Sequence, residues 1–151
     1  MKHFVILFSI FITSCASIQT PFSSKTPERT SSIESKHSCC VVYTYIANIN
    51  GTDTIDWSDE QYLLPGSNNI IVVSSLMAGL KAIQLVNINI SPNTSYKAKA
   101  DYSYTTGEAK LVIYEESTEN IIVTKPMKKY RVYESQSREE TEKIIQKILN
   151  K

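Results

Sequence analysis

Histidine is scarce in this sequence. Among 151 residues only His3 and His37 are histidines, and His3 lies in an apolar N-terminal segment. A histidine-based triad needs a fixed histidine beside its nucleophile. The G-x-S-x-G, H-E-x-x-H and P-loop spacings are missing as well. We therefore expect a protein that is not an enzyme and that has no catalytic residue, cofactor or metal.

An excess of charge of one sign is also missing. The chain has 16 basic and 15 acidic residues, which gives a formal net charge of +1. Recognition of nucleic acid would need lysine and arginine clustered on one face. We therefore expect no nucleic acid partner, and the chain length suits a single domain.

No apolar run is long enough to remain in a membrane. The longest one, residues 4–12, has nine residues, whereas a transmembrane helix needs about 20. Lys2 precedes this run and small residues follow it, which is the plan of a secretory signal. We expect residues 1–14 to be removed as a signal peptide.

The stretch Ile12-Thr13-Ser14-Cys15 resembles the lipobox of bacterial lipoproteins. The resemblance implies that Cys15 becomes the N-terminus, carries acyl chains such as palmitate and anchors the chain to a membrane. Ala16 then implies sorting to the outer membrane, with the domain facing the periplasm. The alternative is cleavage at Ser14-Cys15-Ala16 as a small-x-small site, which would release a soluble protein.

Residues 15–38 contain few apolar side chains. Twelve of the 23 residues from 16 to 38 are Ser, Thr or Pro, and Ile18, Phe22 and Ile33 share no helical or strand period. Such a segment buries too little surface to offset its ordering entropy. We expect residues 15–38 to be a lipidated, disordered tether that ends at His37 and Ser38.

Short β-branched and aromatic runs dominate from residue 39 onward. Asn50-Gly51 and Pro65-Gly66 are turn dipeptides, and residues 76–81 are interpreted as a loop or single helical turn. The runs favour an antiparallel β-sandwich over residues 39–136, with about seven or eight strands. The expected strands are residues 41–49, 52–57, 62–64, 69–75, 82–90, 95–104, 109–115 and 121–125.

Residues 62–72 contain a Leu-x-Pro-Gly turn followed by an apolar strand. This element resembles one found in small envelope lipoproteins with transthyretin-like or immunoglobulin-like sandwiches. The resemblance implies a fold and brings no activity with it.

Residues 137–151 have a different pattern. Residues 137–140 have the S-x-x-E form of a capping box, and an apolar stripe at helical spacing follows. These features predict one amphipathic helix, which is marginal in water unless its stripe is covered. Docking on the sandwich and binding of a partner or membrane both remain open. The stripe consists of Ile144, Ile145, Ile148 and Leu149.

The only tryptophan, Trp57, lies among acidic residues. Asp56 and Asp59 flank it closely, and Asp53 and Glu60 lie slightly further away. The cluster fits a solvated turn, a cation site or a sugar-binding platform, so Trp57, Asp56 and Asp59 form a possible ligand surface.

Three other groups of residues leave alternatives open. Cys39 and Cys40 could be one buried and one exposed thiol, a strained vicinal disulfide or an intermolecular bridge. The nine tyrosines could be rings at the core edge with hydroxyls in water, or a stacking surface for a ligand. The basic run of Lys125, Lys128, Lys129 and Arg131 could be a solvated strand edge or a contact for anionic envelope components.

The sequence favours a membrane-anchored, non-enzymatic lipoprotein of the cell envelope that binds or braces another envelope protein or a cell-wall component. The alternative is a carbohydrate- or small-ligand-binding sandwich, in the periplasm or secreted.

Overall fold

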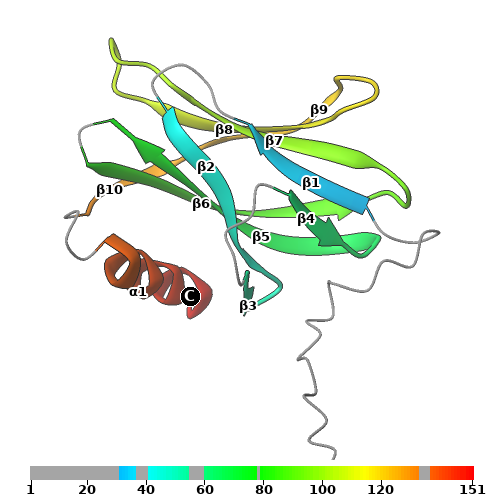
Figure 1. Cartoon of the computed structure of the whole chain (residues 1–151), viewed down its shortest axis with the longest axis horizontal. Helices are drawn as coiled ribbons and strands as arrows, with labels where there is room; N and C mark the ends of the chain where they lie inside the picture. Colours follow the sequence, from blue (N-terminus) through cyan, green and yellow to red (C-terminus); the bar gives the residue numbers. More distant parts are fainter. Residues whose placement is uncertain (1–30, 37–40, 55–59, 78, 133–136) are drawn as a thin grey trace, which may run out of the picture.

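The computed structural model describes residues 31–36, 41–54, 60–77, 79–132 and 137–151. They form two five-stranded sheets and one helix (Figure 1). Sheet A has the order β4-β1-β7-β8-β9, and its strands are β1 Ser31–Lys36, β4 Glu60–Leu63, β7 Ser95–Tyr102, β8 Ala109–Glu115 and β9 Ile121–Pro126. Sheet B has the order β10-β6-β5-β2-β3, and its strands are β2 Val41–Ile49, β3 Thr52–Asp53, β5 Gly66–Leu76, β6 Leu80–Ile90 and β10 Lys128–Arg131. Helix α1 spans Ser137–Leu149.

The main hydrophobic core lies between the two sheets. Along β7, Tyr96, Ala98 and Ala100 are buried, whereas Lys97 and Lys99 between them are part-exposed. The same alternation runs along β8, as expected for strands with one face on a core and one in water. The inward residues pack against those of sheet B in one cluster. The expected β-sandwich is therefore confirmed.

A second, smaller core lies on the outer face of sheet B, where α1 packs (Figure 1). Ile145 is 4% exposed and contacts a cluster that contains Tyr45, Val73 and Ile83. Strand β5 is consequently buried on both faces, which explains its unbroken Ile70-Ile71-Val72-Val73 run. The expected helix exists, and its apolar stripe docks on the protein's own sandwich.

Turn chemistry places two connections where the sequence predicts them, the β2–β3 hairpin and the turn from β4 of sheet A to β5 of sheet B. Asn50 and Gly51 have φ angles of 52° and 86°, the two positive values that a type I′ turn requires. The Gly51 N–H donates to Asn48 Oδ1 (2.9 Å), which closes the β2–β3 hairpin. Gly66 has a φ of 105° directly before the extended run of β5, a conformation that a residue with a side chain rarely adopts.

Residues 31–36 correct the expected tether. They form β1, which lies between β4 and β7 inside sheet A and runs parallel to β7. Ile33 is fully buried in the main core, and Ser31 Oγ donates to the Ser91 carbonyl (2.5 Å). A single isoleucine shows no period in the sequence, yet two neighbouring strands pair with this backbone. The folded part therefore begins before residue 39, and the sandwich is not purely antiparallel.

The chain passes from sheet A to sheet B at Met127. This residue is 6% exposed and separates the edge strand β9 from the edge strand β10. The described residues contain ten strands, more than the seven or eight expected, because β1 and β10 carry little alternation. Most of the basic run lies on β10, at the edge of sheet B, in agreement with its interpretation as a strand edge.

Two expected boundaries also shift. The loop expected at 76–81 is shorter at both ends, since β5 continues to Leu76 and β6 starts at Leu80. Strand β7 ends at Tyr102 rather than at Tyr104, which is 57% exposed. Both differences lie at hairpins. The β5–β6 loop is shorter than its residue types suggest, and the β7–β8 loop is longer.

Candidate functional surface

Several residues that the sequence analysis singles out lie outside the described residues. They include the expected lipidation site and the expected ligand surface. These residues are Cys15, His37, Cys39, Cys40, Asp56, Trp57 and Asp59.

Two described residues flank the possible ligand surface. Asp53 lies on β3, at the edge of sheet B, and Glu60 begins β4, at the edge of sheet A. Asp53 Oδ1 accepts a hydrogen bond from Asn48 Nδ2 (2.7 Å), so this carboxylate helps to hold the β2–β3 hairpin. Within the part of the chain that the structure describes, no three His, Cys, Asp or Glu side chains are grouped so that they could hold a metal ion.

Two of the tyrosines are buried more deeply than rings at the core edge with hydroxyls in water. Tyr43 and Tyr45 share one face of β2 and stack with ring centroids 5.7 Å apart, but this face lies under α1. Tyr45 is 2% exposed and Tyr96 is 4% exposed. The Tyr96 hydroxyl accepts a hydrogen bond from the Ser91 amide (3.0 Å) rather than reaching water. Tyr45 and Tyr96 are therefore core residues, whereas Tyr104 is exposed and the other described tyrosines, among them Tyr114 on the outer face of sheet A, are partly buried.

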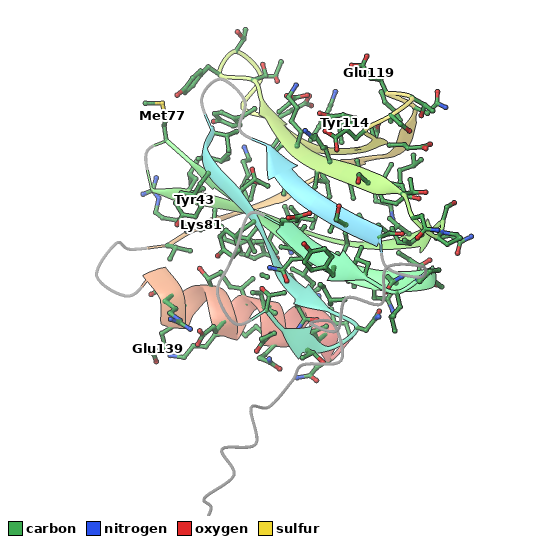
Figure 2. All side chains as sticks on the ribbon, turned by 45° about the vertical axis from the view of Figure 1, so that its right-hand side comes forward. Tyr43, Met77, Lys81, Tyr114, Glu119 and Glu139 are labelled. Atoms are coloured by element: carbon green, nitrogen blue, oxygen red, sulfur yellow. The ribbon has the colours of Figure 1, made fainter. Side chains whose placement is uncertain are left out.

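The outer face of sheet A is formed by the alternate residues of β7 and β8 that point away from the core. It contains a shallow hollow of about 400 Å³, where charged and apolar side chains meet. Tyr114 of β8 pairs with Ile121 of β9, which brings an aromatic ring beside an isoleucine. Figure 2 labels Tyr114 and Glu119 on this side of the molecule. The hollow is lined by Lys99, Asp101, Val112, Tyr114, Glu119 and Ile121.

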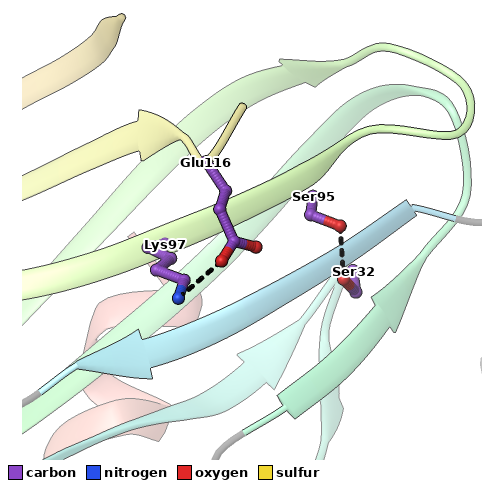
Figure 3. Close-up of polar contacts among 4 residues, drawn as sticks. All are labelled: Ser32, Ser95, Lys97 and Glu116. Carbon is purple, nitrogen blue, oxygen red and sulfur yellow. Dashed lines mark hydrogen bonds and ion pairs between the residues drawn. The ribbon is translucent and has the colours of Figure 1, made fainter. Parts of the chain in front are cut away.

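Ion pairs arrange the charges around this hollow. Lys97 Nζ lies 2.7 Å from Glu116 Oε1, and Lys99 Nζ lies 2.8 Å from Asp101 Oδ1. Figure 3 shows the first pair beside the hydrogen bond from Ser32 Oγ to Ser95 Oγ (3.3 Å), which links β1 to β7. Because all four charged groups are partly exposed, these pairs contribute little stability. Their charges remain accessible to a partner.

The β8–β9 turn is held by its own side chains. The Glu115 carboxylate accepts hydrogen bonds from the hydroxyls of Ser117 and Thr118, both 3.0 Å long. Glu119 follows with a φ of 56°, a left-handed conformation that non-glycine residues adopt infrequently. The turn therefore presents Glu119 and Ile121 in a defined arrangement.

Strand β9 exposes the largest apolar side chains of sheet A. Ile121 is 65% exposed and Ile122 is 42% exposed, on a strand that pairs only with β8. By contrast, exposed Met77 and Tyr104 contact each other at another edge of the molecule. Tyrosine and isoleucine next to accessible charges are suited to recognition of another molecule. Sequence patterns could not indicate this surface, because β9 has no clear alternation.

No helix among the described residues is long and apolar enough to cross a membrane. Comparison with known protein families, curated proteins and solved structures finds no match for this chain.

Proposed function

We propose that this chain is a membrane-anchored, non-enzymatic lipoprotein of the cell envelope that binds another envelope component through the outer face of sheet A. The observation that carries the proposal is the difference between the two outer faces. Helix α1 covers the apolar outer face of sheet B, whereas sheet A presents Tyr114 and Ile121 to solvent beside accessible charges. Among the sheet faces that the structure describes, the outer face of sheet A is therefore the one that offers a partner accessible apolar side chains.

The anchor follows from the lipobox residues, with Cys15 as the lipidated N-terminus and the outer membrane as the location. Fifteen residues separate Cys15 from the first residue of β1. Even fully extended, such a segment spans roughly 50 Å. The sandwich therefore works close to the membrane surface, with its partner in or near the envelope.

The composition of the proposed surface favours a protein as the partner. Tyrosine is among the residues that dominate binding energy, and such residues act best when polar neighbours surround them. Tyr114 lies between Lys97 of β7 and the apolar Ile121 of β9, and Lys99 and Asp101 line the same hollow. We therefore favour an envelope protein as the partner, which the domain binds or braces.

A carbohydrate-binding domain is the second candidate function. One observation favours it over other small-molecule functions: the Tyr114 ring lines the same hollow as the carboxylates of Asp101 and Glu119. An aromatic ring can stack on a sugar while carboxylates accept hydrogen bonds from its hydroxyl groups. The volume of about 400 Å³ is sufficient for a small ligand.

The anchoring and binding parts of the proposal are tested separately. Cys15→Ala should abolish labelling by a fatty-acid analogue and release the chain from membranes. A wild-type chain that is unlabelled and soluble would contradict the anchor.

For binding, membranes are dissolved in detergent so that the lipid anchor no longer holds the chain in the envelope fraction, and the combined variant Tyr114→Ala, Ile121→Ser should then lose co-purification with envelope proteins. Leu64→Ser serves as the control, because Leu64 is 48% exposed and does not line the hollow. Equal retention of both variants would contradict the assignment of this face. Titration of wall oligosaccharides into the full chain would then decide between protein and sugar, since only the second candidate predicts saturable binding that Tyr114→Ala removes.

A further inference from the structure

A polar row crosses the outer face of sheet B at the end of the β5–β6 hairpin. The strand register places Tyr43 of β2 opposite Ser75 of β5, and Ser75 opposite Lys81 of β6. Tyr130 of β10 continues the row beyond Lys81. The next row along these strands is apolar and packs against α1. The row therefore marks the point where the apolar surface under the helix gives way to polar side chains.

Lys81 places a charge where water hardly reaches. Its residue exposure is 5%, and its Nζ donates hydrogen bonds to Tyr43 Oη (2.6 Å) and Ser75 Oγ (2.9 Å). The ammonium also lies 4.6 Å from the centroid of the Tyr43 ring, and Figure 2 labels both residues side by side. Among the described residues, no carboxylate forms an ion pair with Lys81. A buried charge of this kind is costly without a counter-charge.

Not every hydrogen-bond donor of this row has an acceptor within the row. An ammonium group has three N–H donors, and two of them go to the hydroxyls of Tyr43 and Ser75. Each hydroxyl accepts from Lys81 and thereby keeps its own proton to donate. Ser75 also forms a side-chain hydrogen bond with Tyr43 that lowers the pKa of Tyr43, so within the described part of the chain the hydroxyl proton without a protein acceptor is that of Tyr43. Tyr43 and Ser75 are partly exposed, so their hydroxyls can be reached from solvent.

We propose that Lys81, Tyr43 and Ser75 form a binding site for a small oxyanion, either a free phosphate or a carboxylate group. The two hydroxyl oxygens both lie within 2.9 Å of the same nitrogen. One oxyanion can accept from the third ammonium N–H and from the Tyr43 hydroxyl, which Ser75 helps to position, and charge-assisted hydrogen bonds of this type are the stronger ones. The anion supplies the counter-charge for Lys81. This site is separate from the surface on sheet A and does not depend on it.

The pKa of Tyr43 gives the site a spectroscopic signal. Burial acts to raise this pKa, but hydrogen bonds with Lys81 and Ser75 and the positive charge of Lys81 outweigh burial and hold the pKa below 10.0. A bound anion would accept the phenol proton and place negative charge beside it. Binding should therefore raise the pKa of Tyr43, which shifts the tyrosinate absorbance to higher pH.

The test titrates inorganic phosphate and, in a second series, sodium acetate into the full chain while tyrosinate absorbance and calorimetric heat are followed. Saturable binding to phosphate, to acetate or to both is expected, and the series that saturates identifies the ligand class. Lys81→Met, which keeps the apolar stem, should weaken binding at least about tenfold. Tyr43→Phe and Ser75→Ala should each weaken it by less. Lys110→Met, on the exposed side of β8, should leave it unchanged.

Denaturant melts accompany each variant, so that loss of binding is not confused with loss of folding. Lys81→Met removes a buried charge and should fold at least as well as the wild type. Absence of saturable binding of both anions would overturn the proposal. Equal binding by Lys81→Met and the wild type would overturn it too, because the anions would then be interacting with the surface in general.

Discussion

The outer faces of the two sheets differ in what covers them. On sheet B, Val73 and Ile83 are almost completely buried because α1 lies over them. On sheet A, Val112 and Tyr114 occupy equivalent outward positions on β8 and remain part-exposed. Strand β5 of sheet B carries apolar residues on both sides, whereas in β7 of sheet A the buried apolar residues alternate with lysine and aspartate. One face is thus part of the folded core, and the other is available for binding.

This difference shows what the C-terminal helix does. A sheet that is apolar on both faces cannot leave one of them in water, since the exposed patch would favour association. The α1 stripe removes that patch by supplying Ile145, Ile148 and Leu149. The helix therefore contributes to stability, and the proposed recognition surface lies elsewhere.

The largest expected effect comes from placing the same charge on each face. Val73→Asp should destabilise the fold by about 4 kcal/mol or more, because the carboxylate would lie in the apolar contact under α1. Val112→Asp should cost less than about 1 kcal/mol, since its side chain is part-exposed. Urea melts of the two variants would measure both values. Similar losses would mean that the outer face of sheet A is also covered in solution.

The next largest effect is expected from a charge placed in the apolar stripe of α1. Ile145→Asp should lower the free energy of unfolding by several kcal/mol, because Ile145 is 4% exposed against sheet B. Gln146→Asp is the matched control, one residue further along on the exposed side of α1. If the denaturation midpoint is the same for both variants, the helix does not dock in the monomer, and its stripe becomes the candidate surface for a partner.

A pH-dependent effect is expected from Tyr43 and Tyr45, which lie on the same face of β2. Burial, with the nearby charges of Tyr43 and Glu142, raises the pKa of Tyr45 well above 10.0, while contacts with Lys81 hold the pKa of Tyr43 below 10.0 against its burial. Above pH 10 the unfolded chain releases the Tyr45 proton and the folded chain retains it, so Tyr45 makes stability fall as pH rises. Ionised Tyr43 contributes stability above pH 10 that is lost as pH falls through its folded pKa.

Urea midpoints at pH 8 and pH 11 would separate these two contributions. The decline between the two pH values should be smaller in Tyr45→Phe than in the wild type, and larger in Tyr43→Phe. The opposite order would mean that the Tyr43–Lys81 contact or the burial of Tyr45 is wrong.

The smallest effect concerns the solvent side of α1. Arg138 Nε lies 3.0 Å from Glu142 Oε1, with both side chains at least half exposed. Arg138→Ala should therefore change the free energy of unfolding by only about 0.3–0.5 kcal/mol. The change should shrink further in high salt. A loss of several kcal/mol in thermal melts would show that this side of the helix is packed against something.

The sequence predicts the parts of the fold that repeat a pattern. Alternation along β7 correctly predicts a strand, and the Asn50-Gly51 dipeptide correctly predicts a hairpin. The helical spacing of the apolar stripe correctly predicts α1. Strand β1 could not be recognised, because Ile33 is its only apolar residue and its pairing partners lie far away in the chain. The surface around Tyr114 could not be predicted either, because it depends on the register between separate strands. In the sequence Lys81 resembles any lysine on a strand, and only the strand register places it beside Tyr43 and Ser75.

The central claim is that the outer face of sheet A, and not the helix-covered face of sheet B, contacts the partner. Site-specific photocrosslinking in cells that make the full chain tests it most directly, with the reactive residue at position 114 or at position 146. We expect a discrete crosslinked species from position 114 that disappears when Ile121→Ser is added, and none from position 146. Crosslinking from position 146 alone would contradict the claim and would assign recognition to the helix.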